Sequence, residues 1–202
     1  MHSTFFLYNS VNIHLVIYMK TVKVQYPYLL VYPFPTVLVS SVDSRGKYNC
    51  LAVSWQTPLS FDPPLIGVSI GYKRYSYHLI HHSGEFVINV MPIDKAKVVL
   101  RAGEISGKNV DKFKVLGLTV EQGKSVKAPV IQEAIAAIEC MVEEEVAVGD
   151  HALFIGRVVA THINPEYYDR SGKPYLKKIK PLLYGGKNQF CTIDPSSIVD
   201  LS

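Results

Sequence analysis

Cysteine is scarce in this 202-residue chain, which contains only Cys50, Cys140 and Cys191. The three lie far apart, and no Cys-x-x-Cys pair occurs. A disulfide framework needs an even set of cysteines and a structural zinc site needs closely spaced ligands, so neither is predicted. A reducing, cytoplasmic setting is the simplest expectation for a chain with this cysteine usage.

The chain also lacks a long apolar run. Its apolar first segment, residues 1–18, is interrupted by asparagine, serine and histidine and has neither a basic start nor a small-residue cleavage site. Such a segment is too short and too polar to span a bilayer, and it does not have the layout of a secretory signal. We therefore expect no membrane partner, a partly disordered N-terminal extension over residues 1–22, and one domain over residues 23–202.

A strong excess of charge and the common nucleotide-binding motifs are missing as well. The net charge is only +4 and forms no continuous basic stripe, so no nucleic-acid partner is predicted. No Gly-x-Gly-x-x-Gly or Walker-type lysine is present, which disfavours a doubly wound nucleotide-binding fold. His78, His81 and His82 have helical spacing, but no carboxylate or thiolate accompanies them. They are predicted to face solvent, and no metal site is expected.

What the chain does contain is a series of short, β-branched, apolar segments separated by turns. Residues 36–42 and 47–54 flank the turn sequence Asp43-Ser-Arg-Gly46 and predict a hairpin. Residues 134–147 contain helix-favouring alanine and glutamate, but their alternation has a period near two, so we predict a strand paired with residues 151–163. Further strands are predicted at 65–70, 85–90 and 182–184, helices at 77–82 and 94–102, a loop with a short helix at 103–117, and a loop at 167–180. These elements predict a mainly β fold, a mostly antiparallel barrel with peripheral helices.

The most distinctive stretch lies between the strands at 49–54 and 65–70. Residues 55–64 hold three prolines, which fix φ and remove backbone donors, so the stretch is predicted to be a stiff loop rather than part of either strand. It also holds Trp55, the only tryptophan, beside hydroxyl and amide side chains. A flat apolar face next to convergent polar groups suits a planar, hydrogen-bonding ligand; the alternative is an ordinary core tryptophan.

A second polar feature follows where the helix at 77–82 is expected to begin. Ser76 stands at the predicted N-cap, so its hydroxyl and the following amides could bind an anion, with Lys73 and Arg74 nearby. The alternative is an ordinary serine cap without a ligand.

Four stretches of the chain form a recognisable set. They are Asn49-Cys-Leu-Ala-Val-Ser-Trp55 with Ser60-Phe-Asp-Pro-Pro64, Arg74-Tyr-Ser76, Ser106-Gly107 with Asp111-Lys-Phe113, and Gly149-Asp-His151 with Leu153-Phe-Ile-Gly-Arg-Val158. By their order and spacing over residues 28–190, the chain resembles the flavin reductase-like, FMN-binding split-barrel family, nearest to its flavoredoxin-like branch. The resemblance implies a six-stranded antiparallel Greek-key split β-barrel that forms a homodimer with FMN near the interface.

The resemblance also implies which residues contact the flavin ring. Asn49, Leu51 and Ala52 would line the flavin with side chain and backbone. Ser54 would present donors to the ring edge, and Trp55 would pack on or beside the isoalloxazine.

A second group of residues would hold the rest of the cofactor. Ser76, with the charge of Arg74 and Lys112, would bind the phosphate, although Lys112 taken alone is a plain surface lysine. His151 follows a Gly-Asp turn and would lie near the flavin as the catalytic residue, hydrogen-bonding the cofactor or the nicotinamide. The alternative for His151 is a turn histidine. Tyr184 would supply a further aromatic wall.

The function that the resemblance implies is hydride transfer from NADH or NADPH to N5 of FMN, with electrons then passed to an acceptor. This chemistry belongs to the cofactor, so the lack of a recognisable acid-base set does not count against it. One alternative is a flavoredoxin-like electron-transfer protein that holds FMN and receives electrons from a redox partner protein. Another is a flavin-free structural or interaction barrel.

Overall fold

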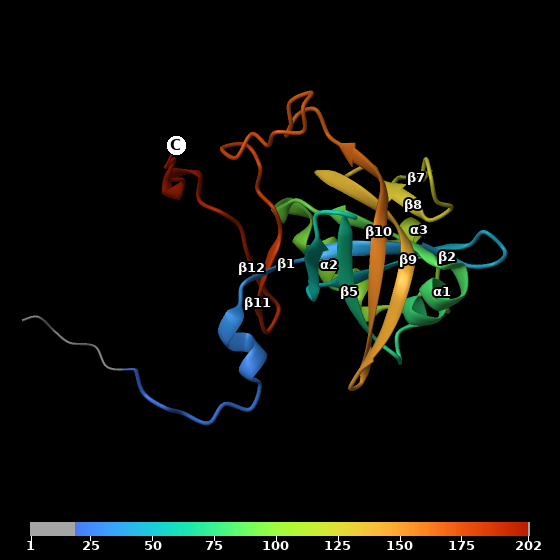
Figure 1. The fold of residues 1–202 in the computed structure, drawn as a ribbon, viewed down its shortest axis with the longest axis horizontal. Helices are drawn as coiled ribbons and strands as arrows, with labels where there is room; N and C mark the ends of the chain where they lie inside the picture. Colours follow the sequence, from blue (N-terminus) through green and yellow to red (C-terminus); the bar gives the residue numbers. More distant parts are fainter. Residues whose placement is uncertain (1–18, 202) are drawn as a thin grey trace, which may run out of the picture.

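The computed structural model describes residues 19–201, and one antiparallel sheet organises it (Figure 1). Seven strands lie in the order β3-β2-β6-β9-β10-β5-β4. Their bounds are β2 Val37–Val42, β3 Tyr48–Val53, β4 Gln56–Ser60, β5 Leu65–Gly71, β6 Glu85–Val90, β9 Ala136–Val148 and β10 His151–Ile163. Because β3 and β5 also come into contact, the sheet curls round on itself. The predicted mainly β, antiparallel split-barrel fold is confirmed, although the main sheet has seven strands where six were expected. Most of the expected N-terminal extension, residues 1–22, lies outside the described residues.

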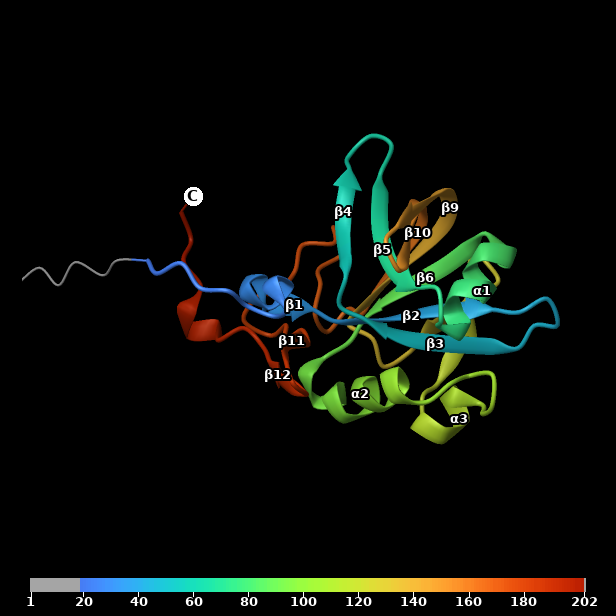
Figure 2. The same ribbon diagram turned by 90° about the horizontal axis from the view of Figure 1, so that it is seen from below.

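The remaining elements surround this barrel. The helices are α1 Tyr75–Ser83, α2 Ala96–Glu104 and α3 Lys112–Leu116, and the minor strands are β1 Phe34–Pro35, β7 Val120–Gln122, β8 Pro129–Ile131, β11 Leu183–Gly186 and β12 Gln189–Cys191. Single 3-10 turns lie at Pro27–Val31, Ile93–Lys95 and Pro195–Ser197. Figure 2 shows α2 and α3 along β3, with the small β1-β11-β12 sheet and both described ends of the chain beside the barrel. Among the described residues, no helix is long and apolar enough to cross a membrane.

Strands β2 and β3 are buried on both faces. Val37, Val39 and Leu51 face the barrel interior, whereas Leu38 and Cys50 face the layer of α2 and α3. A strand covered on both sides needs apolar residues at successive positions. This explains why apolar residues stand at neighbouring positions in both strands, and why Ser40, Ser41 and Asn49 are buried among them.

A buried carboxylate holds the loop between β7 and β8 in place. Glu139 of β9 is fully buried and accepts hydrogen bonds from the backbone N–H groups of Lys124, Ser125 and Val126 at 2.7 to 3.0 Å. His162 of β10 contacts the same carboxylate through Nε2. Burial raises the pKa of Glu139, but these hydrogen bonds outweigh burial and hold that pKa below its ordinary 4.5. The carboxylate therefore stays ionised near neutral pH and anchors the loop.

The structure corrects the prediction for residues 55–64. Part of this stretch is strand β4, which pairs with β5 through Gln56, Thr57 and Pro58, with a register shift before Ser60. An edge strand tolerates proline, because the missing N–H can face away from the ladder. The prolines therefore confine the segment to the sheet edge but do not prevent it from pairing.

Most other predicted elements are confirmed. Both hairpins form, and residues 134–147 do contain strand β9. The helix predicted at 77–82 begins two residues earlier, at Tyr75. The strand predicted to stop before Gly185 continues through Gly186 and pairs with β12, which was not predicted, across an irregularity in the register. A glycine does not end a strand when the neighbouring strand continues to pair with it through backbone hydrogen bonds.

Candidate functional site

Two adjoining cavities lie where β3, β5 and the start of α1 meet. The first, of about 170 Å³, is lined by the end of β3, Trp55, the end of β5 and His151. The second, of about 100 Å³, is lined by Asn49, Ser76, Lys112 and the loop after α2. Leu51 and Arg74 contribute to both, so the two cavities form one continuous site.

The first cavity has an aromatic wall. The Trp55 ring lies 5.0 Å from the imidazole of His151 and 5.4 Å from the ring of Tyr28, and it remains 38% exposed. At the base of this wall, Ser54 shares a 2.7 Å hydrogen bond with Thr36, and Ser54 also lines the cavity. This end of the site combines flat apolar surface with a hydroxyl group, which suits a planar ligand.

The second cavity has a buried cation in its wall. Lys112 is 2% exposed, and its Nζ donates to the carbonyls of Cys50 and Ala102 at 2.6 Å each. Burial lowers the pKa of Lys112 from its ordinary 10.5; the Cys50 thiol opposes this change, and the nearby guanidinium of Arg74 adds to it. Among the described residues, no carboxylate pairs with this ammonium. A buried cation without an acidic partner is costly, so it favours an anionic ligand.

Asn49 provides a second unsatisfied group beside this cation. Its Nδ2 donates to Ser76 Oγ at 2.7 Å, while its Oδ1 is buried and has no hydrogen-bond partner. Turning the amide over would let Ser76 donate to the oxygen and would present the NH₂ group as a free donor. Buried polar groups are seldom left unpaired, so Asn49 too indicates a ligand.

The helix start differs from the prediction in detail. The N-cap of α1 is Arg74, which makes no side-chain cap, and Ser76 is the second helical residue with its hydroxyl engaged by Asn49. Ser76 still lines the second cavity, near the first N–H groups of α1, which have no intrahelical partner. The predicted N-cap is therefore wrong, yet the serine lies where an anion would need it.

His151 is held by its neighbour in the chain. Its Nδ1 lies 2.6 Å from Asp150 Oδ1, and this hydrogen bond lowers the pKa of Asp150. Opposite His151 in the β5–β10 ladder stands Gly71, where a Cβ would lie 3.4 Å from His151 Nε2. The imidazole is thus fixed between Asp150 and Trp55, with its edge on the first cavity.

All but one of the predicted site residues line these cavities. Tyr184 does not: it lies in β11, with its ring 5.7 Å from Tyr32 and 5.2 Å from Phe190. A chain of ring contacts through Tyr32, Tyr28 and Trp55 links it to the site. Tyr184 therefore belongs to an aromatic cluster beside the barrel, formed with Tyr32 and Phe190.

Sequence reasoning missed part of the second cavity. Glu104, Ile105, Ser106 and Gly107 complete its wall. The Ser-Gly pair was the available signal, because a glycine in a polar loop often marks a close approach of backbone to another group. Gly107 is such a place: a Cβ there would lie 2.8 Å from Asn49 Cγ and closer still to its Oδ1.

We expect Gly107→Ala to weaken ligand binding at the second cavity by about tenfold, because the new methyl group must displace Asn49 or the loop. The matched control is Gly103→Ala in α2, where a Cβ would meet only Ala52 Cβ at 3.5 Å, an ordinary contact. Binding titrations of both variants check this. Equal affinities would show that the contact at Gly107 relaxes without disturbing the site.

Comparison with known proteins adds an independent line of evidence. Residues 29–194 match the model of the flavin reductase like domain. A protein of Archaeoglobus fulgidus is 42% identical over 143 residues, covering 71% of this chain and 78% of that protein. Among solved structures, an FMN-binding protein from Thermus thermophilus is similar with a TM-score of 0.79 and 31% identity, covering 90% of this chain and 100% of that one. The flavoredoxin of Desulfovibrio vulgaris (Miyazaki F) gives a TM-score of 0.75 and 29% identity, covering 81% of this chain and 88% of that one. The matched segment contains the whole barrel and every residue of the two cavities, and this chain belongs to the flavin reductase-like family.

Proposed function

We propose that the chain binds FMN across the two cavities and acts as an NAD(P)H-dependent flavin oxidoreductase. The observation that carries the proposal is the difference in chemical character between the two ends of the site. One end has a buried ammonium without a carboxylate partner, and the adjoining end has an exposed indole flanked by an imidazole. FMN has the same two-ended character, with a phosphate at one end and a planar ring system at the other.

The phosphate end of the site would be formed by Lys112, Arg74, Ser76 and Asn49. Lys112 supplies charge from inside the wall, and Arg74 supplies it from the surface, where its Nη1 is held by the carbonyl of Gly103. The Asn49 amide and the free N–H groups at the start of α1 add neutral donors. These are donors that a phosphate dianion requires, and they lie on three separate elements that the barrel holds rigidly.

The ring end would be formed by Leu51, Ala52, Ser54, Trp55 and His151. Bound FMN would supply the redox chemistry, accepting a hydride from NADH or NADPH at N5 and passing electrons to an acceptor. The chain itself contributes orientation: β3 and Trp55 wall the cavity. His151, held by Asp150, presents its Nε2 edge, where it could donate or accept a hydrogen bond.

A second candidate is an electron carrier that holds FMN and exchanges electrons with a protein partner. The similarity to the flavoredoxin of Desulfovibrio vulgaris (Miyazaki F) favours it. The exposure of Trp55 is compatible with both candidates, because an open ring face can meet either a nicotinamide or another protein.

We expect the absorbance of protein-bound FMN near 450 nm to fall when NADH or NADPH is added to the purified protein without air. Absorbance spectra recorded during an anaerobic titration with each nucleotide measure this reduction. Free FMN under the same conditions is the control. If neither nucleotide bleaches the bound flavin while a reduced ferredoxin does, the chain is an electron carrier. A protein that binds no FMN at all would exclude both candidates.

We also propose a homodimer. Apolar side chains project from the segment beside the barrel and from the β4–β5 turn: Leu30 is 72% exposed, Val31 62%, and Phe61 is fully exposed. Tyr28 lies in the same 3-10 turn as Leu30 and Val31, and its ring is 5.4 Å from that of the exposed Trp55. Exposed apolar side chains that adjoin in this way are typical of surfaces that a second subunit covers.

A further inference from the structure

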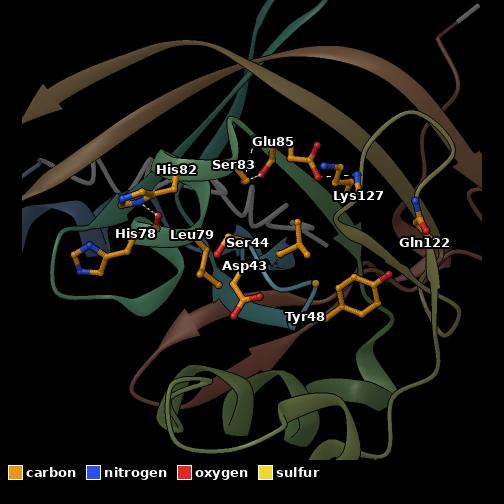
Figure 3. A pocket seen from close by; sticks show the side chains of 12 residues that line it. Asp43, Ser44, Tyr48, His78, Leu79, His82, Ser83, Glu85, Gln122 and Lys127 are labelled. Atoms are coloured by element: carbon orange, nitrogen blue, oxygen red, sulfur yellow. Dashed lines mark hydrogen bonds between the residues drawn. The ribbon is translucent and has the colours of Figure 1, made fainter.

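A further cavity lies outside the proposed flavin site. It has a volume of about 800 Å³ and lies between the β2–β3 turn, α1 and the β7–β8 loop. Figure 3 shows lining side chains from all three elements, with Tyr48, Gln122 and Lys127 on one side of the view and His78 and His82 on the other. A hollow of this size is within the range of small-molecule sites.

Each of the two carboxylates in this cavity has one oxygen engaged by neighbouring backbone N–H groups. Asp43 Oδ1 accepts from the backbone N–H groups of Arg45 and Lys47 at 2.8 Å each, and Asp43 Oδ2 lies 3.5 Å from the Arg45 guanidinium. Glu85 Oε1 accepts from the backbone N–H groups of Lys127 and Ala128 at 2.6 and 2.8 Å. Both acids therefore stabilise local backbone through one oxygen each, while Glu85 Oε2 makes no hydrogen bond among the described residues.

The donors, by contrast, are free. Within the described part of the chain, the Lys127 ammonium, the Gln122 amide and the Tyr48 hydroxyl make no side-chain hydrogen bond, although all three residues line the cavity. The imidazole of His78 is also without a hydrogen-bond partner and is in ring contact with Tyr77. The cavity thus offers an ammonium, an amide and a hydroxyl as unengaged donors, which a ligand carboxylate can accept from.

The rest of the lining is apolar. Val42 and Leu79 are buried at its floor, and the Tyr48 ring, held edge-on by Phe113 at 6.4 Å, forms one side. From the free donors and this apolar floor we infer that the cavity is a second ligand site, which takes a small aromatic carboxylic acid. The carboxylate would meet Lys127 and Gln122 at the rim, and the ring would lie against Tyr48 and Leu79.

This site is separate from the proposed flavin site. The two are lined by different residues, and β3 forms part of the wall between them: Tyr48 faces the large cavity, while the adjacent Asn49 faces the flavin site. In α1, Ser76 faces one cavity and Leu79 the other. Successive β residues point to opposite faces, so both ligands can be bound at once.

The test uses 2-naphthoate as the probe and the full-length protein saturated with FMN. We expect saturable binding by isothermal titration calorimetry with no change in the bound flavin spectrum. The Kd should weaken about fivefold in Lys127→Met, the size of one exposed charge pair, and by a similar factor for 2-naphthamide, which has no charge. Lys124→Met is the matched control, because Lys124 lies in the same loop, does not line the cavity and holds Glu139 only through its backbone.

A bulky side chain at the exposed rim provides a second variant. Ser44→Trp should abolish naphthoate binding by filling the cavity while leaving FMN binding unchanged. Absence of naphthoate binding, equal Kd values for Lys127→Met and Lys124→Met, equal binding of acid and amide, or displacement of FMN by naphthoate would each overturn the inference. If the protein binds no FMN, the same titrations on the flavin-free protein still decide the matter, so the two proposals fail separately.

Discussion

Replacing Lys112 by methionine is expected to weaken FMN binding about tenfold to a hundredfold. A charge-assisted hydrogen bond contributes about 1.5 to 3 kcal/mol, and Lys112 is the only buried lysine among the described residues that lines the site. Methionine has a similar length and no charge, so it fills the same channel between Cys50 and Ala102. Quenching of FMN fluorescence on titration with protein measures the change in Kd.

Riboflavin separates a phosphate contact from a general disturbance of the site, because it has the same ring system without the phosphate. Lys112→Met should lower the affinity for FMN but leave that for riboflavin nearly unchanged. The matched control is Lys114→Met, which removes an exposed lysine from the same helix. If FMN and riboflavin lose affinity equally, Lys112 supports the barrel wall and does not contact the phosphate. Unchanged FMN affinity would remove the phosphate assignment altogether.

Glu139→Gln is expected to lower the free energy of unfolding by about 3 kcal/mol. The wild-type carboxylate is fully buried and accepts three backbone N–H groups in addition to the contact with His162. The amide has one oxygen instead of two, so donors of the 124–126 segment lose a charged acceptor and face an NH₂ group. Urea unfolding followed by circular dichroism measures the difference. Glu143→Gln is the matched control, since Glu143 lies in the same strand in an exposed pair with Arg157 and should change stability by less than about 1 kcal/mol.

The pH dependence of this effect has a definite sign. The pKa of Glu139 in the folded protein lies below its ordinary 4.5, so the folded state binds fewer protons than the unfolded state in that range. The stabilisation is therefore complete above about pH 4.5 and is lost as the pH falls through the folded pKa. The gap between wild type and Glu139→Gln should shrink on acidification. A gap that stays constant down to acid pH would mean that the Glu139 side chain acts by shape and not by charge.

The sequence by itself predicts most strands of the main sheet and, through the family resemblance, most of the residues that line the candidate site. Alternation in residues 134–147 was enough to predict β9 despite its alanine and glutamate content, because side-chain burial follows the period of two more closely than it follows intrinsic propensity. The residues themselves indicate Trp55 and Ser76, and the family resemblance adds Asn49, Lys112 and His151 as site residues. The predicted strands agree with the observed ones because the local sequence pattern and the overall fold favour the same structure along most of this chain.

Other features depended on tertiary contacts. Nothing local in residues 55–64 shows that Pro58 lies at an open sheet edge, and this position alone permits β4 to form. The N-cap of α1 was misplaced by two residues, because Ser76 is recruited by Asn49 of β3, 27 positions away in the chain. Tyr184 is similarly drawn to Tyr32 and Phe190 in the aromatic cluster.

Lys112 is the site residue whose environment depends most on the tertiary structure. In the sequence it is one lysine among many, in a polar, glycine-punctuated region that is typical of a surface. Only the packing of α2 and α3 on β3 encloses its ammonium between two backbone carbonyls beside an unpaired amide oxygen. The sequence shows the residue type, but the burial of its ammonium depends in part on β3, since Cys50 lies 62 residues before Lys112. Packing between segments so far apart leaves no local pattern in the sequence.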